Sequence, residues 1–165
     1  DGDTPLHLAC ISGSVDVVAA LIRMAPHPCL LNIVAQTPLH LAALTAQPNI
    51  MRILLLAGAE PTVRDRDGER CVHLAAEAGH IDILRLLVSH GADINAREGS
   101  GRTPLHIAIE GCNEDLANFL LDECEKLNLE TAAGLTAYQF ACIMNKSRMQ
   151  NILEKRGAET VTPPD

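Results

Sequence analysis

Imidazole side chains recur in this sequence at one fixed interval, and imidazole can bind a metal ion or act as a general base. The residues concerned are His7, His40, His73 and His106. Each lies 33 residues from the next, and Gln139 occupies the following position of the series. A glutamine forms hydrogen bonds as imidazole does, but it cannot act as a base. We therefore interpret these side chains as structural donors that connect neighbouring loops, and we predict no metal site.

The six cysteines could form disulfides or a zinc site, but their spacing favours neither. None belongs to a C-x-x-C pair, and the intervals match no zinc template. Cys10 and Cys142 occupy the same place in the 33-residue period as Ala43, Ala76 and Ile109. A position that accepts cysteine, alanine or isoleucine is a packing position. We expect reduced thiols in a cytosolic or nuclear protein.

Motifs that indicate an enzyme are missing from the sequence. It contains no phosphate-binding loop, nucleophile elbow, HExxH motif or EF-hand loop. The carboxylates are expected mostly in loops and on outward helix faces, where a catalytic pair would arise only by coincidence. We predict no enzymatic activity, no catalytic residue and no cofactor.

A six-residue motif surrounds each member of the histidine series. It reads TPLHLA from Thr4 and Thr37, RCVHLA from Arg70, TPLHIA from Thr103 and TAYQFA from Thr136. A motif that returns at a constant interval of this size is typical of stacked-repeat proteins. Threonine is a favourable N-cap, and proline suits the first helical position. Each motif therefore predicts the start of a short helix.

Residues suited to tight turns flank these short helices. Two residues before each motif stand Gly2, Ala35, Gly68, Gly101 and Gly134. Glycine permits the positive φ of such a turn, so we assign the four glycines a structural role. Nine residues after each motif begins stand Gly13, Ala46, Gly79, Cys112 and Asn145, where the helix should end. Ala46 and Cys112 do not readily adopt the left-handed conformation of a helix stop.

A longer second helix follows in each period, for example over Val15–Met24 and Ile81–His90, and then a polar extended loop. This order resembles the ankyrin repeat over almost the whole chain. The resemblance implies an all-α solenoid of about five stacked helix-turn-helix units with short hairpin-like loops. We predict one ankyrin-repeat domain over 1–159, with 160–165 as the start of a C-terminal tail. Its units are 1–33, 34–66, 67–99, 100–132 and 133–159.

Within ankyrin proteins, the chain resembles the IκB inhibitors of Rel/NF-κB transcription factors. The resemblance lies in DGDTPLHLACISGSVDVVAALI, TPLHLAALTAQPNIMRILLLAGAEPTVRD, DGERCVHLAAEAGHIDILRLLVSHGADINARE and GLTAYQFACIMNKSRMQNILEKRGAE. It implies a cytoplasmic protein of developmental signalling that binds a Rel dimer and keeps it from DNA and from the nucleus. We expect a monomer before the partner binds. Two alternatives stay open, a scaffold or adaptor with another partner and a nuclear IκB-like transcriptional cofactor.

The formal net charge of −8 is unevenly distributed along the chain. Counted over the successive 33-residue units it is −2, +1, −3, −5 and +1. No basic stripe with interleaved aromatic residues is present, so we predict no direct nucleic-acid binding. No apolar run is long enough to cross a membrane, and we predict no membrane partner.

The charges of the fourth unit and of two loops are the candidate partner-binding residues. They are Arg64, Asp65, Arg66, Asp67, Glu69, Arg97 and Glu98 in the loops, and Glu110, Glu114, Asp115, Asp122, Glu123 and Glu125 in the fourth unit. We predict that the loop tips orient a Rel dimer and that the acidic unit attracts its basic residues. The alternative is that the acidic face is only solvated surface.

Overall fold

The computed structural model describes residues 2–25, 27–124 and 126–160. These residues form ten α-helices and no β-strand, which confirms the all-α prediction. None of these helices has both the length and the apolar character needed to span a membrane. The chain divides into two compact units, residues 1–93 and 94–165.

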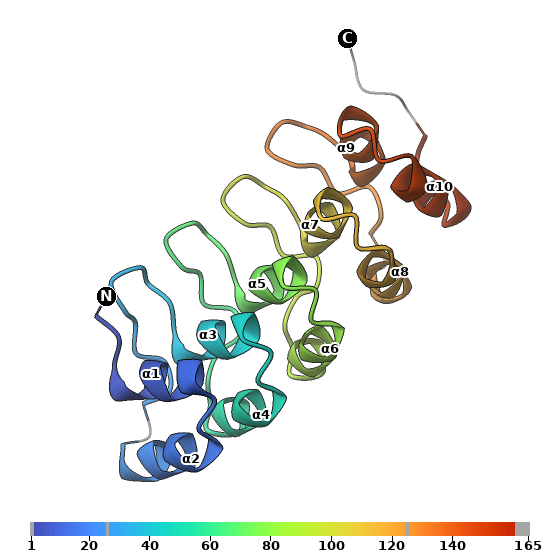
Figure 1. Cartoon of the computed structure of the whole chain (residues 1–165). Coiled ribbons are helices and arrows are strands. Elements are labelled where there is room, and N and C mark those ends of the chain that lie inside the picture. Colours follow the sequence, from blue (N-terminus) through green and yellow to red (C-terminus); the bar gives the residue numbers. More distant parts are fainter. Residues whose placement is uncertain (1, 26, 125, 161–165) are drawn as a thin grey trace. The chain divides into compact units, whose positions relative to one another are not determined.

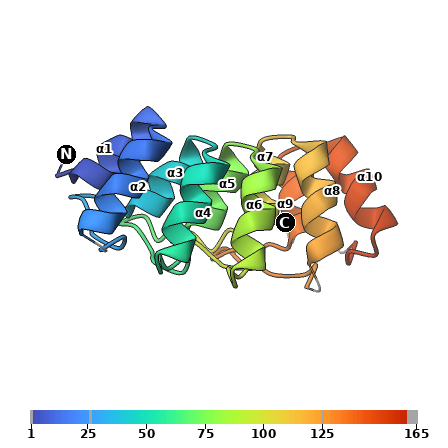
Figure 2. The ribbon, with the colours of Figure 1, turned by 90° about the horizontal axis from the view of Figure 1, so that it is seen from below.

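The first unit contains three pairs of helices. They are α1 (Pro5–Ser12), α2 (Val15–Met24), α3 (Pro38–Leu44), α4 (Pro48–Leu56), α5 (Cys71–Glu77) and α6 (Ile81–Ser89). Figure 1 shows α1, α3 and α5 in one row and α2, α4 and α6 in a second row, with the hairpin loops extending from the side of the first row. In Figure 2 the helices of the second row lie side by side. Packing within and between the rows buries Leu39, Ile50 and Leu54 completely.

The second unit contains two pairs of helices, α7 (Pro104–Glu110), α8 (Glu114–Glu123), α9 (Ala137–Ile143) and α10 (Ser147–Lys155). α7 packs against α8 and α9, and α10 packs against α8 and α9. Leu116, Leu120 and Leu153 are buried between them. The loops before α7 and α9 project from the α7 and α9 side of this unit (Figure 1).

The short helices begin where the six-residue motif predicts. The Thr4 side chain accepts a hydrogen bond from the backbone N–H of His7, and Pro5 is the first residue of α1. Pro38 and Pro104 begin α3 and α7 in the same way. A proline at this position removes an N–H that would have no partner inside the helix.

The turn after the short helix has one conformation whatever residue occupies it. Gly13 has a φ of 72°, and Ala46, Cys112 and Asn145 have φ values of 52°, 54° and 53°. Ala46 and Cys112 therefore adopt the left-handed conformation that their side chains disfavour. The following N–H groups require it, because Gln47 N donates to the carbonyl of Ala42 as in other helix stops. Repeat geometry overrides local preference here.

Candidate partner-binding surface

The loop before α5 contains a carboxylate that is turned inward. Asp65 is buried, and its Oδ1 accepts hydrogen bonds from the backbone N–H groups of Asp67 and Glu69 at 3.0 and 2.9 Å. The backbone closes the same turn, because Asp65 N donates to Glu69 O at 2.9 Å. Asp65 was a candidate for partner binding, but its carboxylate is occupied in shaping the loop.

Glu98 has the same role in the loop before α7. Its carboxylate accepts hydrogen bonds from Ser100 N at 3.1 Å and from Arg102 N at 3.0 Å, and the Ser100 hydroxyl donates to it as well. Burial raises the pKa of Glu98, but these donors and the Arg102 guanidinium outweigh burial and lower the pKa to about 2. Glu98 is therefore a charged turn residue with little surface for a partner.

The same repeat position holds a turn-forming side chain in every hairpin. Asn32 Oδ1 accepts from Val34 N and Gln36 N at 3.1 and 2.9 Å. Thr131 Oγ1 accepts from Leu135 N at 3.3 Å. This role was not foreseen from the sequence, although an acceptor side chain recurs there every 33 residues. The Asn32 side chain therefore stabilises the turn over residues 32–36, which contains neither aspartate nor glycine.

Other charges of the loops are exposed. Arg64, Arg66 and Asp67 lie at the surface of the first unit and form no ion pair with the described residues. Glu69 is half-buried, and Arg97 is exposed in the second unit. Arg66 N donates to Val34 O at 3.1 Å, which joins two neighbouring tips. Among the candidates in the loops, the exposed side chains of Arg64, Arg66, Asp67 and Arg97 are accessible to a partner.

Arginine side chains neutralise much of the acidic fourth unit. Three ion pairs are involved, Arg102 with Glu110, Arg148 with Glu114 and Arg156 with Asp122. By contrast, Asp115 and Glu123 are exposed and form no ion pair with the described part of the chain. Glu125 lies outside the described residues. The charge count of the sequence therefore overstates the free negative charge.

The structure divides the candidates of the second unit between two faces. Arg97, Glu98 and Glu110 lie in the hairpin loop and on α7, whereas Glu114, Asp115, Asp122 and Glu123 lie on α8. In Figure 1 the hairpin loops extend from the side of α7 and α9, and α8 lies on the opposite side. Loop tips and α8 carboxylates thus do not form one continuous patch within this unit.

The first histidine of the series, His7, connects two neighbouring loops. His7 Nδ1 accepts a hydrogen bond from Thr4 N at 3.1 Å, so the proton belongs on Nε2, which lies 2.9 Å from Gln36 O in the next loop. Together, the two contacts connect the loop before α1 with the loop before α3. Gln139 Oε1 accepts from Thr136 N at 3.0 Å, which reproduces half of the arrangement.

Burial keeps two of these imidazoles neutral. It lowers the pKa of His40, and it lowers the pKa of His106 to about 4. The Nε2 atoms of both residues are buried near carbonyls of the next loop without reaching good hydrogen-bond geometry. His106 also makes an edge-on contact with Phe140, with 5.6 Å between ring centres. His73 Nδ1 accepts a hydrogen bond from Arg70 N at 3.0 Å, as His7 Nδ1 does from Thr4 N.

The four predicted turn glycines all have positive φ. The values are 71° for Gly2, 78° for Gly68, 81° for Gly101 and 74° for Gly134. Gly101 has a second constraint, since a Cβ at this position would lie 2.4 Å from Ala132 N. All four glycines thus have a backbone conformation that residues with a side chain disfavour.

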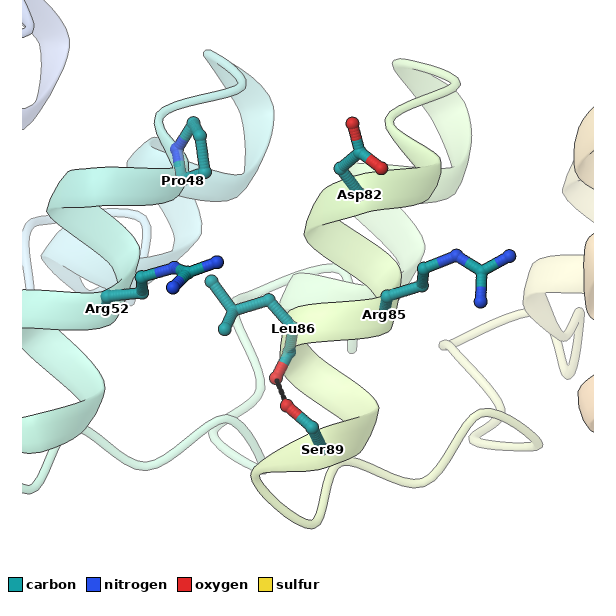
Figure 3. A pocket seen from close by; sticks show the side chains of 6 residues that line it. All are labelled: Pro48, Arg52, Asp82, Arg85, Leu86 and Ser89. Atoms are coloured by element: carbon teal, nitrogen blue, oxygen red, sulfur yellow. Dashed lines mark hydrogen bonds between the residues drawn. The ribbon is translucent and has the colours of Figure 1, made fainter.

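A groove of about 510 Å³ lies between α4 and α6 in the first unit. Figure 3 shows its lining residues, with Arg52 extending toward Leu86 and Arg85 extending away from it. Ser89 donates its hydroxyl proton to Leu86 O at 2.8 Å. The polar groups do not converge on one point, so the groove lacks the arrangement that chemistry requires. In the described ranges, no three His, Cys, Asp or Glu residues are placed to hold a metal ion.

Exposed apolar side chains on the first repeat were not foreseen. Val17 is 50% exposed, whereas Ile50, its equivalent in the second repeat, is fully buried. Leu8 is 56% exposed, and its equivalent Leu41 is 8% exposed. Periodicity assigns all four to the core, so their difference depends on the neighbouring repeat. Leu41 and Ile50 lie on α3 and α4, which pack against α1 and α2 of the preceding repeat.

Repeated pairs of a short and a longer helix, joined by hairpin loops, define a helical repeat domain. The chain belongs to the ankyrin-repeat family, whose model of three ankyrin repeats matches residues 1–65, 39–131 and 72–162. Among curated proteins, the chain is similar to the NF-kappa-B inhibitor cactus of Drosophila yakuba, with 94% identity over 33 residues. This segment is 20% of the chain and 7% of the relative. The expected resemblance to IκB proteins, and to the insect inhibitor Cactus in particular, is confirmed.

Proposed function

We propose that this chain binds a Rel/NF-κB-type transcription factor dimer and inhibits it, blocking its binding to DNA and retaining it in the cytoplasm. The observation that carries the proposal is the 94% identity to an NF-kappa-B inhibitor within a chain built of ankyrin repeats. The match covers a small part of that relative, so the partner and its inhibition are inferred for this chain.

The exposed charges support a basic partner with a defined orientation. A DNA-binding dimer must carry cationic side chains. Asp115 and Glu123 offer carboxylates without an intramolecular ion pair in the described structure. Arg64, Arg66 and Asp67 place charges of both signs at a loop tip, where they can orient a partner but do not by themselves favour a basic one. Such charges accelerate association and set orientation more than they add affinity.

A DNA competition experiment tests the proposal. The chain is titrated into a preformed complex of a Rel dimer and its labelled DNA site, and the free DNA is measured. An inhibitor releases the DNA, whereas a nuclear cofactor forms a slower-moving ternary complex. If the DNA complex is unchanged and the immobilised chain captures no Rel protein, the chain is a scaffold or adaptor for another partner.

The acidic helix has its own test. Neutralising Glu114, Asp115, Asp122, Glu123 and Glu125 together should slow association with the Rel dimer and flatten its salt dependence. The matched control neutralises exposed carboxylates of the first unit that are not candidates for partner binding, Asp16, Glu60, Glu77, Asp82 and Asp93. Equal effects of the two variants, or unchanged association of both, would mean that the face of α8 is only solvated surface.

A further inference from the structure

The last repeat places two arginines on the carboxylates of α8. Arg148 Nη1 lies 3.2 Å from Glu114 Oε1, and the Arg156 guanidinium pairs with Asp122. Glu114 and Asp122 are eight residues apart on α8, as are Arg148 and Arg156 at α10. Eight helical residues span about 12 Å. The two ion pairs therefore connect packed helices at points about two turns apart.

Both ion pairs can open without disturbing the core. The Arg148 side chain is 87% exposed and the Asp122 side chain 62% exposed. Contacts of this kind are weak because water and salt screen them. Buried apolar side chains, Met149 and Leu153, also hold α10 in place.

We propose that Arg148 and Arg156 compete with the basic side chains of a partner for the carboxylates of α8, so that the last repeat restrains binding there. The proposal rests on the proposed function, which brings a cationic partner to this helix. A carboxylate that already holds a guanidinium attracts a second cation less strongly, and the partner must displace the first. Displacement then frees α10 from two of its connections to α8.

A cationic peptide tests this competition without a Rel protein. Fluorescein-labelled octa-arginine is titrated with the full chain at low ionic strength, and its dissociation constant is measured by anisotropy. The test variant is Arg148→Gln with Arg156→Gln. The matched control is Lys146→Gln with Lys155→Gln, which removes the same charge from the same region at residues that form no ion pair with the described residues.

The arginine variant should bind the peptide about threefold tighter than the lysine variant. A further variant, Arg148→Lys with Arg156→Lys, should bind as the unmodified chain does. Equal gains in the arginine and lysine variants would reduce the effect to net charge and overturn the proposal, as would an absence of peptide binding by all of them.

The peptide titration and the DNA competition experiment test separate claims, so either claim can be contradicted without the other. If the arginine variant gains peptide affinity while a Rel–DNA complex ignores the chain, the competition on α8 stands and the Rel-inhibitor function does not. If the chain releases Rel from DNA but the two glutamine variants bind the peptide equally, only the role of the arginines is lost.

Discussion

The carboxylates of the hairpin loops and those of α8 are held in opposite ways. Asp65 and Glu98 are buried, and backbone N–H groups of their own loops hold them. Glu114 and Asp122 are more exposed, and arginines 34 residues further along the chain hold them. In the sequence all four are acidic residues of a repeat. Their neighbours decide that the first two maintain a turn and the last two are available for exchange.

The largest expected effect comes from the loop. Glu98→Ala removes an acceptor from two backbone N–H groups and leaves the Arg102 guanidinium without that partner. Hydrogen bonds to a charged group contribute about 1.5–3 kcal/mol, so the free energy of unfolding should fall by about 2–3 kcal/mol. Urea denaturation measures the change. The matched substitution Glu114→Ala should cost less than about 1 kcal/mol, and equal losses would contradict the distinction between loop and helix.

The buried imidazole of His106 and the buried carboxylate of Glu98 should affect the free energy of unfolding over different pH ranges. His106 has a pKa of about 4 in the folded chain, so below pH 6.5 the unfolded chain binds a proton that the folded chain does not. Protonation of His106 in the unfolded chain should therefore lower the free energy of unfolding by about 2 kcal/mol between pH 7 and pH 5. Glu98 contributes above pH 4.5, and its contribution is lost as pH falls toward 2.

Denaturation midpoints at a series of pH values test these windows. His106→Gln, which copies the glutamine found at position 139 of the last repeat, should remove the part of the slope between pH 7 and pH 5 that His106 causes. If this variant keeps the full slope of the unmodified chain, the imidazole is not the responsible group.

A smaller gain is expected where repeat geometry opposes local preference. Ala46 has a φ of 52°, which glycine adopts without strain. Ala46→Gly should therefore raise the free energy of unfolding by about 0.5–1 kcal/mol. Ala78 lies beside the equivalent turn of the third repeat with a right-handed conformation, so Ala78→Gly should stabilise nothing. Thermal unfolding compares the stability of the two variants. A loss of stability in Ala46→Gly would show that the backbone of Ala46 is not strained.

The smallest effect belongs to the ion pairs of α8. Asp122→Asn should lower the free energy of unfolding by about 0.2–1 kcal/mol at low salt, because the pair with Arg156 is exposed. Raising the salt to about 1 M should abolish the difference, since screening then acts within a few ångströms. A difference that persists at high salt would show that Asp122 is as firmly held as Glu98.

Local chemistry made much of the fold predictable. Thr4 and Pro5 begin a helix because of their own side chains, and Gly101 permits a turn because it lacks a Cβ. The strict 33-residue register then extends these assignments to every repeat. The register does not show where the neighbours of equivalent residues differ. Val17 and Ile50 are equivalent, yet only Ile50 is buried, and the register could not show that Asp65 is turned inward.

The sequence by itself indicated the repeat, the helix starts and the turn glycines. The helix starts and the turns depend on the conformational preferences of a few consecutive residues, which the sequence displays directly. The contact of His7 with Gln36, 29 residues away, depends on how neighbouring repeats stack. Only the tertiary structure decided which carboxylates are free. The ion pairs of Glu114 and Asp122 join residues 34 apart, and Coulomb attraction acts through the distance between atoms, which helix packing sets.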